Sequence, residues 1–435
     1  MKILHVVHEF PPNAAGTGII TCELSKEMAK RNDVYVLYPA AREGLYTLNS
    51  YKKNGLRVYE LAMSLGIRIR KMTKLKVSYA DRKVEKRFRE ILEEVKPDVI
   101  HFQHLAMLSA SLIKVAKERE IPVVLTLHDY WFICPRAQLL KYDYTVCTGP
   151  DEECSNCFNC WNKGLAEEIA EFLENYAIPR SFSKKAIEIV LKLRNRRQDF
   201  VERSKYMKTL LLEVDKITAP SNFLRGIFLN YGIPSDKMVF LENGVSLNIF
   251  RGFRKRRKKK LCFGFVGGIL KHKGVHVLIE AFNKVEDENV ELRIYGNYDL
   301  RSKYLKGLLV KIRNPNIQFI KRFKDVKEPY SNVDVLIFPS IWYENCPLVL
   351  GEASITGTPV IASNIGAIPE FVRDGENGLL FEVGNVAHLF QKISTIIKSP
   401  DLITYFRENI RQVKTVEEQA NELERIYGNV RARKT

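Results

Sequence analysis

Short apolar runs alternate with amphipathic segments along most of the chain, and this alternation limits the fold more than any other feature. In the first half, Ile3–Val7, Val34–Tyr38 and Val99–Phe102 have the length and composition of buried strands, and Ala80–Val95 has a helical pattern. Strands that alternate with helices predict βαβ units and a parallel sheet. The chain is therefore expected to have a doubly wound α/β fold.

The alternation stops at residue 129 and resumes near residue 215. Because this interruption is too long for an ordinary loop, we interpret 129–215 as a Cys-rich and helical insertion with its own structure. We predict a Rossmann-like N-terminal domain over 1–250, a second over 258–412 and a final helical segment over 413–435. Open α/β sheets bind ligands at the carboxyl ends of their strands, so two such domains predict a ligand-binding cleft.

The chain is basic, with 69 Lys and Arg against 51 Asp and Glu and a formal net charge of +18. Such a charge favours nucleotide phosphates, nucleic acid or anionic lipid as partners. Nucleic acid is disfavoured because no recognised nucleic-acid module accompanies the charge. The basic runs are Arg68–Lys76, Arg194–Lys208 and Arg251–Lys260. They are interpreted either as solvated linker and helix faces or, for Arg194–Lys208 and Arg251–Lys260, as contacts with an anionic membrane surface.

No apolar run approaches the ~18–20 residues that span a bilayer. The first residues, MKILHVVHEF, are typical of a strand rather than of a signal peptide. We therefore expect a cytoplasmic protein, either free or peripheral at the inner face of the cell membrane.

The segment Phe265–Gly274 combines a strand end, the glycines Gly267 and Gly268, the cations Lys271 and Lys273, and a helix start. Glycine lets backbone N–H groups approach a phosphate, and a helix N-terminus and a lysine both favour an anion. A tight βα turn with solvated lysines explains the same residues. The P-loop spacing is absent, which disfavours an ATPase of that kind.

The segment Pro339–Glu352 places two carboxylates eight residues apart. Glu344 falls in a loop after a strand, Pro347 suits a first helical position, and Glu352 falls near the second turn of the helix. Carboxylates accept hydrogen bonds from sugar and ribose hydroxyls, so the segment indicates a sugar or nucleoside site.

In this order, together with Glu242–Val245, Ser363–Glu370 and Asp374–Phe381, these motifs resemble those of the retaining, nucleotide-sugar-dependent glycosyltransferases of family 4, also called group 1. The resemblance runs from Met1 to at least Phe381. It implies a GT-B fold, in which two Rossmann-like domains face a central cleft and a C-terminal helix packs back on the N-terminal domain.

The resemblance also implies roles for the second domain. Glu344 would contact donor sugar hydroxyls near the anomeric carbon, Glu352 would bind the nucleotide ribose, and Lys273 would neutralise the diphosphate leaving group. Fixed positive charge and N–H groups stabilise the charge that develops there, and no cofactor would be required for catalysis. Further donor-binding residues would be Gly267, Gly268, Lys271, Asn345, Cys346, Pro347 and Leu348.

One position departs from the family pattern. Many relatives carry Arg where this chain has Gly268, so either Lys271 or another cation replaces that charge, or phosphate binding is weaker.

In the first domain, the βα loop Phe10–Gly18 resembles the family's glycine loop, and Gly16 is its best match for donor binding. His128, in Thr126–Trp131, resembles the family histidine that hydrogen-bonds the donor sugar, and Asp129 would orient its ring or line the acceptor site. A plain βα turn and a structural histidine are the simpler interpretations.

The function implied is transfer of a sugar, with retention, from a UDP- or GDP-sugar to a glycan or lipid-linked acceptor. Same-face attack, in which the leaving phosphate takes the acceptor proton, fits better than a double displacement, because no second carboxylate is evident. Two alternatives stay open: a nucleotide-sugar epimerase, and an inactive GT-B protein that binds sugar nucleotide or membrane.

Five of the eight cysteines fall between residues 134 and 160. Thiols at this spacing are typical of zinc or iron–sulfur sites. A Cys-bearing segment of some relatives would match Cys134, Cys147, Cys157 and Cys160, with Cys154 as an alternative ligand. Disulfides and free buried thiols are the other interpretations. A structural site that pins the insertion is favoured over a catalytic one.

Overall fold

The computed structural model describes residues 1–174, 187–188, 191–192, 195–256, 259–321, 323 and 325–432. The chain divides into two compact units: unit 1 comprises Met1–Gly244 and Val416–Thr435, and unit 2 comprises Val245–Thr415. No helix in the described ranges is long and apolar enough to cross a membrane.

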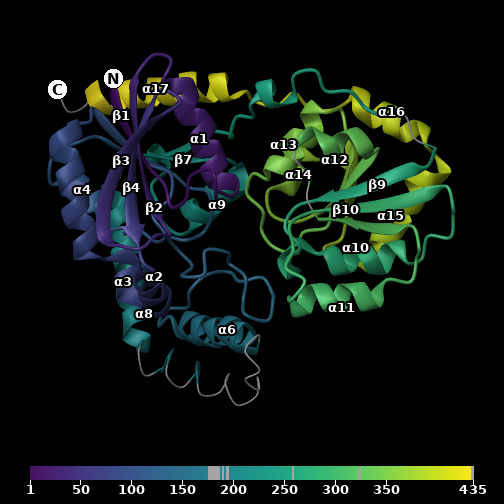
Figure 1. Ribbon diagram of the computed structural model, residues 1–435, viewed down its shortest axis with the longest axis horizontal. Helices are drawn as coiled ribbons and strands as arrows, with labels where there is room; N and C mark the ends of the chain where they lie inside the picture. Colours follow the sequence, from purple (N-terminus) through teal and green to yellow (C-terminus); the bar gives the residue numbers. More distant parts are fainter. Residues whose placement is uncertain are drawn as a thin grey trace. The chain divides into compact units, whose positions relative to one another are not determined.

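Unit 1 is built on an eight-stranded sheet (Figure 1) with the order β3-β4-β2-β1-β5-β6-β7-β8. All neighbouring strands are parallel except β3 and β4, which are antiparallel. The strands are β1 (Lys2–Val6), β2 (Asp33–Ala40), β3 (Leu45–Lys53), β4 (Leu56–Met63), β5 (Val99–Phe102), β6 (Val123–Thr126), β7 (Lys216–Ala219) and β8 (Met238–Phe240).

The helices of unit 1 cover this sheet and form the insertion. They are α1 (Gly16–Met28), α2 (Leu65–Thr73), α3 (Leu75–Tyr79), α4 (Arg82–Val95), α5 (Leu112–Lys117), α6 (Ser155–Glu174), α8 (Arg197–Glu213), α9 (Asn222–Asn230), α17 (Val416–Ala432) and the 3₁₀ turn η1 (Ser235–Lys237). Part of the predicted insertion 129–215 lies outside the described residues.

Helix α4 shows how the sequence sets these elements. The Asp81 side chain caps its first turn by accepting a hydrogen bond from the Lys83 backbone N–H, and Lys96 ends it in the left-handed conformation. Val84 and Phe88 lie one helical turn apart and are fully buried, so one face packs on the sheet.

The C-terminal helix α17 packs beside α1 (Figure 1), and its Ala420, Leu423 and Tyr427 belong to the same buried core as Leu24 of α1. The Tyr427 hydroxyl lies 2.6 Å from Nδ1 of His101 on β5. The predicted packing of the C-terminal helix on the N-terminal Rossmann-like unit is therefore confirmed.

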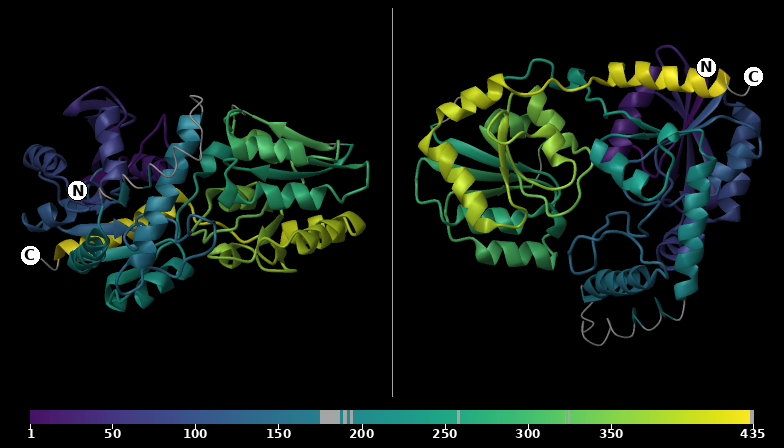
Figure 2. Two further views of the ribbon diagram at one scale, coloured as in Figure 1. Left: turned by 90° about the horizontal axis from the view of Figure 1, so that it is seen from below. Right: turned by 180° about the vertical axis from the view of Figure 1, so that it is seen from behind.

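Unit 2 has a six-stranded parallel sheet with the order β11-β10-β9-β12-β13-β14. Figures 1 and 2 show α10 and α11 on one face of it and α12 and α13 on the other. Its strands are β9 (Leu261–Val266), β10 (Val290–Tyr295), β11 (Ile317–Ile320), β12 (Val335–Phe338), β13 (Val360–Ser363) and β14 (Gly378–Phe381); its helices are α10 (Val275–Phe282), α11 (Lys303–Lys311), α12 (Lys327–Asn332), α13 (Leu348–Ile355), α14 (Ile368–Phe371), α15 (Val386–Lys398), α16 (Asp401–Glu408) and the 3₁₀ turns η2 (Leu247–Phe250) and η3 (Lys271–Lys273).

Each sheet has one topological switch point, where the strand order reverses. In unit 1 it lies between β1 and β5, since β2 flanks β1 on the other side. In unit 2 it lies between β9 and β12, since β10 flanks β9 on the other side. Ligands of open α/β sheets bind at the carboxyl ends of the strands that meet there.

Candidate functional site

The loop after β9 contains Gly274, and any other residue at this position would force the neighbouring backbone to move. Gly274 has φ of 72°, and a Cβ on it would lie 1.8 Å from the carbonyl oxygen of Pro339. The absence of a side chain lets η3 lie against the loop after β12, where the Ile341 N–H donates to the His272 carbonyl over 2.9 Å. The two loops flanking the switch point are therefore joined through their backbones.

This contact brings together two side chains that the sequence predicted separately. The Lys273 ammonium donates to Glu344 Oε1 over 2.6 Å, and the same oxygen accepts from Ser340 Oγ at 2.8 Å and Trp342 Nε1 at 2.7 Å. Glu344 is buried, whereas the Lys273 side chain is 23% exposed. The ammonium also lies 5.3 Å from the centroid of the Trp342 ring. The carboxylate thus holds a partly exposed cation and keeps two further donors.

The Ser363–Glu370 motif supports the same loop from its other side. The Ala367 N–H donates to the Glu344 carbonyl over 2.9 Å. Gly366 has φ of 61°, and a Cβ there would lie 2.7 Å from that carbonyl oxygen. This motif therefore fixes the backbone that carries Glu344.

Helix α13 begins directly after this loop, with Pro347 at its N-cap. Asn345, Cys346 and Leu348 consequently lie at the helix N-terminus, where the helix dipole favours an anion. Glu352, one turn further, accepts a hydrogen bond from the Tyr330 hydroxyl at 2.6 Å, and burial raises the pKa of its carboxyl group.

The loop after β9 also carries Gly267, Gly268 and Lys271. Gly267 has φ of 153° and follows the strand end, while Gly268 is exposed beside Leu270. Lys271 opens η3. The three residues therefore lie on the same loop as Lys273, at the carboxyl end of β9.

In unit 1, three histidines follow three strands at the same distance. His8, His104 and His128 each come two residues after the end of β1, β5 and β6, respectively. The rings of His8 and His104 lie across the switch point with their centroids 4.2 Å apart. His8 and His104 were not predicted as site residues. Their position two residues after a strand end, which they share with His128, was the sequence signal that could have identified them.

These histidines are held by neutral and acidic partners. His128 Nε2 lies 2.8 Å from Gln103 Oε1, and His104 Nε2 lies 3.0 Å from Asp129 Oδ2. Asp129 Oδ1 accepts a hydrogen bond from the Trp131 N–H at 2.8 Å. Burial lowers the pKa of His128 to about 3, and burial also places that of His8 well below its usual range. The imidazoles of His8 and His128 are therefore neutral at physiological pH.

The first βα loop of unit 1 places its glycines differently from the prediction. Gly16 is the first residue of α1, after Ala15 at the N-cap. A side chain does not fit at Gly18, because its Cβ would lie 2.7 Å from the Ala14 Cβ and 2.8 Å from the Glu9 carbonyl oxygen. Gly18 is therefore the glycine of this loop that packs closely against its neighbours, and donor binding by Gly16 stays a prediction.

The cysteines of the insertion are gathered at one place. All five are thiols. Cys134, Cys147, Cys157 and Cys160 line a single cavity, whereas Cys154 is not among its lining residues.

Two doubly wound sheets, with charged and polar side chains at both switch points, define the class of the protein as an α/β enzyme of the GT-B fold. Over 99% of the chain, the structure is similar to two solved structures at 16% identity each: Anabaena Alr3699/HepE in complex with UDP (TM-score 0.65, 100% of that chain) and sucrose-phosphate synthase (tll1590) from Thermosynechococcus elongatus (TM-score 0.68, 99% of that chain).

Two family profiles match the sequence: glycosyltransferase family 4 over residues 14–148 and glycosyl transferases group 1 over residues 248–413. The chain therefore belongs to the group 1 glycosyltransferases of the family 4 type, as the motifs predicted.

Curated relatives match shorter stretches. The capsular polysaccharide biosynthesis glycosyltransferase CapM of Staphylococcus aureus is 30% identical over 34% of this chain and 40% of its own length. The D-inositol 3-phosphate glycosyltransferase of Streptomyces scabiei is 28% identical over 40% of this chain and 44% of its own. The matched part thus spans about two fifths of the length of these relatives.

Proposed function

We propose that the chain transfers a sugar from a nucleoside diphosphate sugar, with UDP-sugars as the first candidates and GDP-sugars as the second, to a glycan or lipid-linked acceptor. The observation that carries this proposal is the Lys273–Glu344 pair at the switch point of unit 2. A solved structure with the same fold contains UDP and glucose, which supports a uridine nucleotide.

In this proposal, Lys273 moves from Glu344 to the diphosphate as the glycosyl–phosphate bond breaks. Glu344 keeps the hydrogen bonds from Ser340 and Trp342, so the lysine can leave without stranding a buried carboxylate. Glu344 then accepts from sugar hydroxyls, and the N-terminus of α13 donates N–H groups to the developing charge.

The remaining roles follow the same chemistry. Glu352 binds the ribose by exchanging its hydrogen bond from Tyr330 for one from a ribose hydroxyl. His128, as a neutral imidazole, hydrogen-bonds the donor sugar, and the configuration is retained by same-face attack. Because Lys273 supplies the positive charge, turnover is expected without added Mg²⁺ or Mn²⁺.

The test is donor hydrolysis and transfer with a panel of UDP- and GDP-sugars, preselected by thermal shift. Lys273→Ala and Glu344→Ala are expected to lose turnover, while the exposed controls Lys306→Ala and Glu288→Ala retain it. Turnover that is unaffected by both site variants would refute the assignments. Nucleotide binding without turnover in the wild type would instead indicate an inactive sugar-nucleotide binder.

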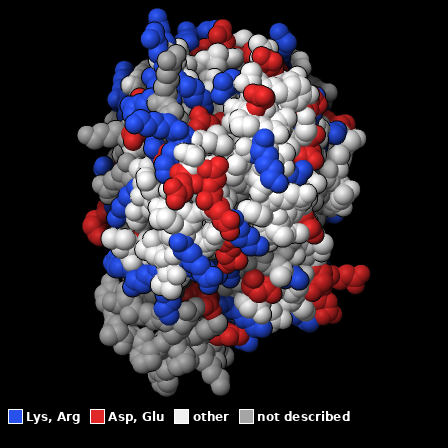
Figure 3. Space-filling model, turned by 90° about the vertical axis from the view of Figure 1, so that its right-hand side faces the viewer, with Lys and Arg blue, Asp and Glu red and all other residues white. Residues whose placement is uncertain are grey.

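We also propose a cytoplasmic location with peripheral attachment to anionic membrane. Part of the basic run Arg251–Lys260 is committed to the fold, since Lys255 bonds the Val333 carbonyl at 2.7 Å and Lys260 bonds Asn316 at 3.1 Å. Arg254, Arg256 and Lys259 remain exposed. On the face in Figure 3, basic and acidic side chains are interspersed, so attachment depends on such local runs.

A further inference from the structure

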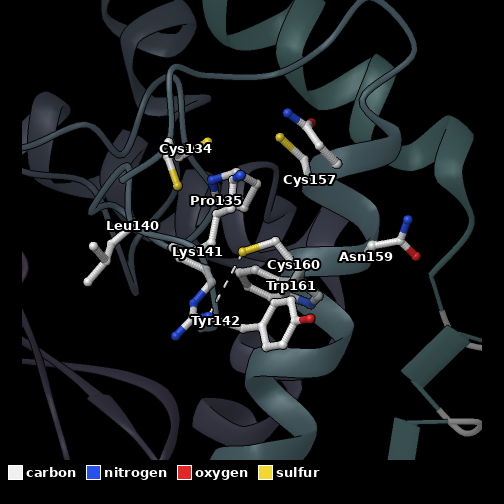
Figure 4. A pocket seen from close by; sticks show the side chains of 12 residues that line it. Cys134, Pro135, Leu140, Lys141, Tyr142, Cys157, Asn159, Cys160 and Trp161 are labelled. Atoms are coloured by element: carbon white, nitrogen blue, oxygen red, sulfur yellow. Dashed lines mark hydrogen bonds between the residues drawn. The ribbon is translucent and has the colours of Figure 1, made fainter. Parts of the chain in front are cut away.

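Four cysteines from two separate segments line one cavity of the insertion, with a volume of about 200 Å³. Figure 4 shows Cys134, on the loop after β6, across from Cys157 and Cys160 on the first turns of α6; Cys147 completes the set. Cys157 and Cys160 are three residues apart on a helix, so they share one face.

Two polar groups already point at these sulfurs. The Gly149 N–H donates to Cys147 Sγ over 3.4 Å, and Arg136 Nη1 lies 4.0 Å from Cys160 Sγ. Donors of this kind stabilise a thiolate more than a thiol, and they are the usual surroundings of metal-bound sulfur.

Arg203 on α8 provides a second, independent observation. It is 1% exposed, its Nε has no hydrogen-bond partner, and among the described residues no carboxylate pairs with it. A buried guanidinium without a counter-charge is costly. Burial lowers its pKa, and the nearby Cys134 and Cys157 oppose this effect.

Thiolates would remove that cost. Four thiolates around a divalent ion carry a net charge of about −2. The buried Arg203 lies near Cys134 and Cys157, and the basic side chains of Arg136 and Lys141 line the cavity itself.

We propose that Cys134, Cys147, Cys157 and Cys160 ligate a thiophilic metal centre, either a zinc ion or an iron–sulfur cluster. Within the described ranges, no three Cys, His, Asp or Glu side chains already form a group suited to a metal ion. Zinc would therefore require the thiols to turn inward, whereas a cluster bridges sulfurs that stand further apart.

Such a centre would act on structure. It would join the loop after β6 to α6, and Arg203 extends this connection by donating to the Trp131 carbonyl. The Trp131 N–H in turn donates to Asp129, which holds His104. The metal centre would thus position the histidine group of unit 1, whatever substrate the chain uses.

The test begins with the full chain purified anaerobically without chelator. Metal analysis, acid-labile sulfide and the visible spectrum are expected to show about one centre per chain. Zinc without sulfide identifies the ion, and iron with sulfide and visible absorption identifies the cluster. The absence of zinc and iron overturns the proposal, as do disulfides among these cysteines in peptide mapping.

Variants then test the ligand set. Cys157→Ser and Cys160→Ser are expected to lower the metal content about tenfold or more. Cys154→Ser is the matched control, since Cys154 is buried in the same segment but does not line the cavity. Equal metal content in all three variants would overturn the proposal.

A measurement on the wild type covers the case in which the variants do not fold. An organomercurial that modifies the thiols is expected to release the metal in proportion to about four modified thiols per centre. Release of metal without modification of these cysteines would contradict the assignment.

Discussion

The switch points of the two units differ in the charge of the side chains that they hold. The switch point of unit 2 holds a lysine and a carboxylate 2.6 Å apart. The two loops that carry them pack together because glycines allow close contact with the neighbouring backbone. The switch point of unit 1 holds the imidazoles of His8, His104 and His128, each two residues after a strand end, and burial lowers the pKa of His8 and of His128. We propose that the same α/β architecture serves two tasks: unit 2 holds an anion, and unit 1 forms hydrogen bonds through the neutral imidazole of His128.

The largest expected effect is that of removing the cation of unit 2. Lys273→Ala should lower kcat by about 10²–10³-fold, because the diphosphate loses its fixed positive charge. The fold should persist, since Glu344 retains Ser340 and Trp342 as donors. Steady-state kinetics and thermal unfolding measure the two effects, with Lys306→Ala as the control. A variant that keeps wild-type kcat would show that the charge of unit 2 serves structure only.

The next effect concerns the glycine that lets the loops of unit 2 meet. Gly274→Ala should destabilise the protein by about 3 kcal/mol or more, because its Cβ would overlap the Pro339 carbonyl and its φ is positive. Urea unfolding measures this change. Gly307→Ala, in α11 with no atom within 4 Å of the added Cβ, should instead be neutral or stabilising by up to about 1 kcal/mol. Equal stability of the two variants would contradict the close approach.

Much of the fold of both units could be predicted from the sequence, because strands and helices have local sequence patterns. The strands carrying both switch points are continuous apolar runs, as expected of sheets buried on both faces. The β3 strand was missed because Leu45–Lys53 lies at the sheet edge and is largely exposed, so it lacks a buried pattern.

The site was less predictable because its contacts are not local. Lys273 and Glu344 were both singled out, but their 71-residue separation gives no sign that they pair. Arg203 belongs to a run that composition describes as a basic helix face, yet it is buried. Only the packing of α8 in the insertion distinguishes it from its exposed neighbours.

The low pKa values of two buried histidines in unit 1 predict how the stability of the protein depends on pH. Burial lowers the pKa of His5 and of His128 to about 3, below the value of about 6.5 for an unfolded chain. The unfolded state then binds more protons below pH 6.5, so stability falls as the pH drops from 6.5 toward 3. Each histidine contributes about 1.4 kcal/mol per pH unit at most.

Selective isotope labelling of histidine and NMR titration measure this directly. The resonances of His5 and His128, assigned from His5→Gln and His128→Gln variants, should stay flat between pH 8 and about 5.5. A midpoint near 6.5 for His128 would remove the electrostatic difference between the two switch points.

The smallest expected effect is that of replacing exposed cations near the start of unit 2. Replacement of Arg254, Arg256 and Lys259 by Gln should weaken binding to anionic vesicles by about 1 kcal/mol per residue and leave binding to neutral vesicles unchanged. Vesicle flotation at two salt concentrations measures this, with a Lys303→Gln, Lys306→Gln pair on α11 as the matched control. Because screening acts over about 8–10 Å in physiological salt, a true surface contact weakens as salt rises. If flotation does not depend on the anionic lipid content, these cations are solvated linker residues, and the positive charge of unit 2 acts only on the nucleotide through Lys273.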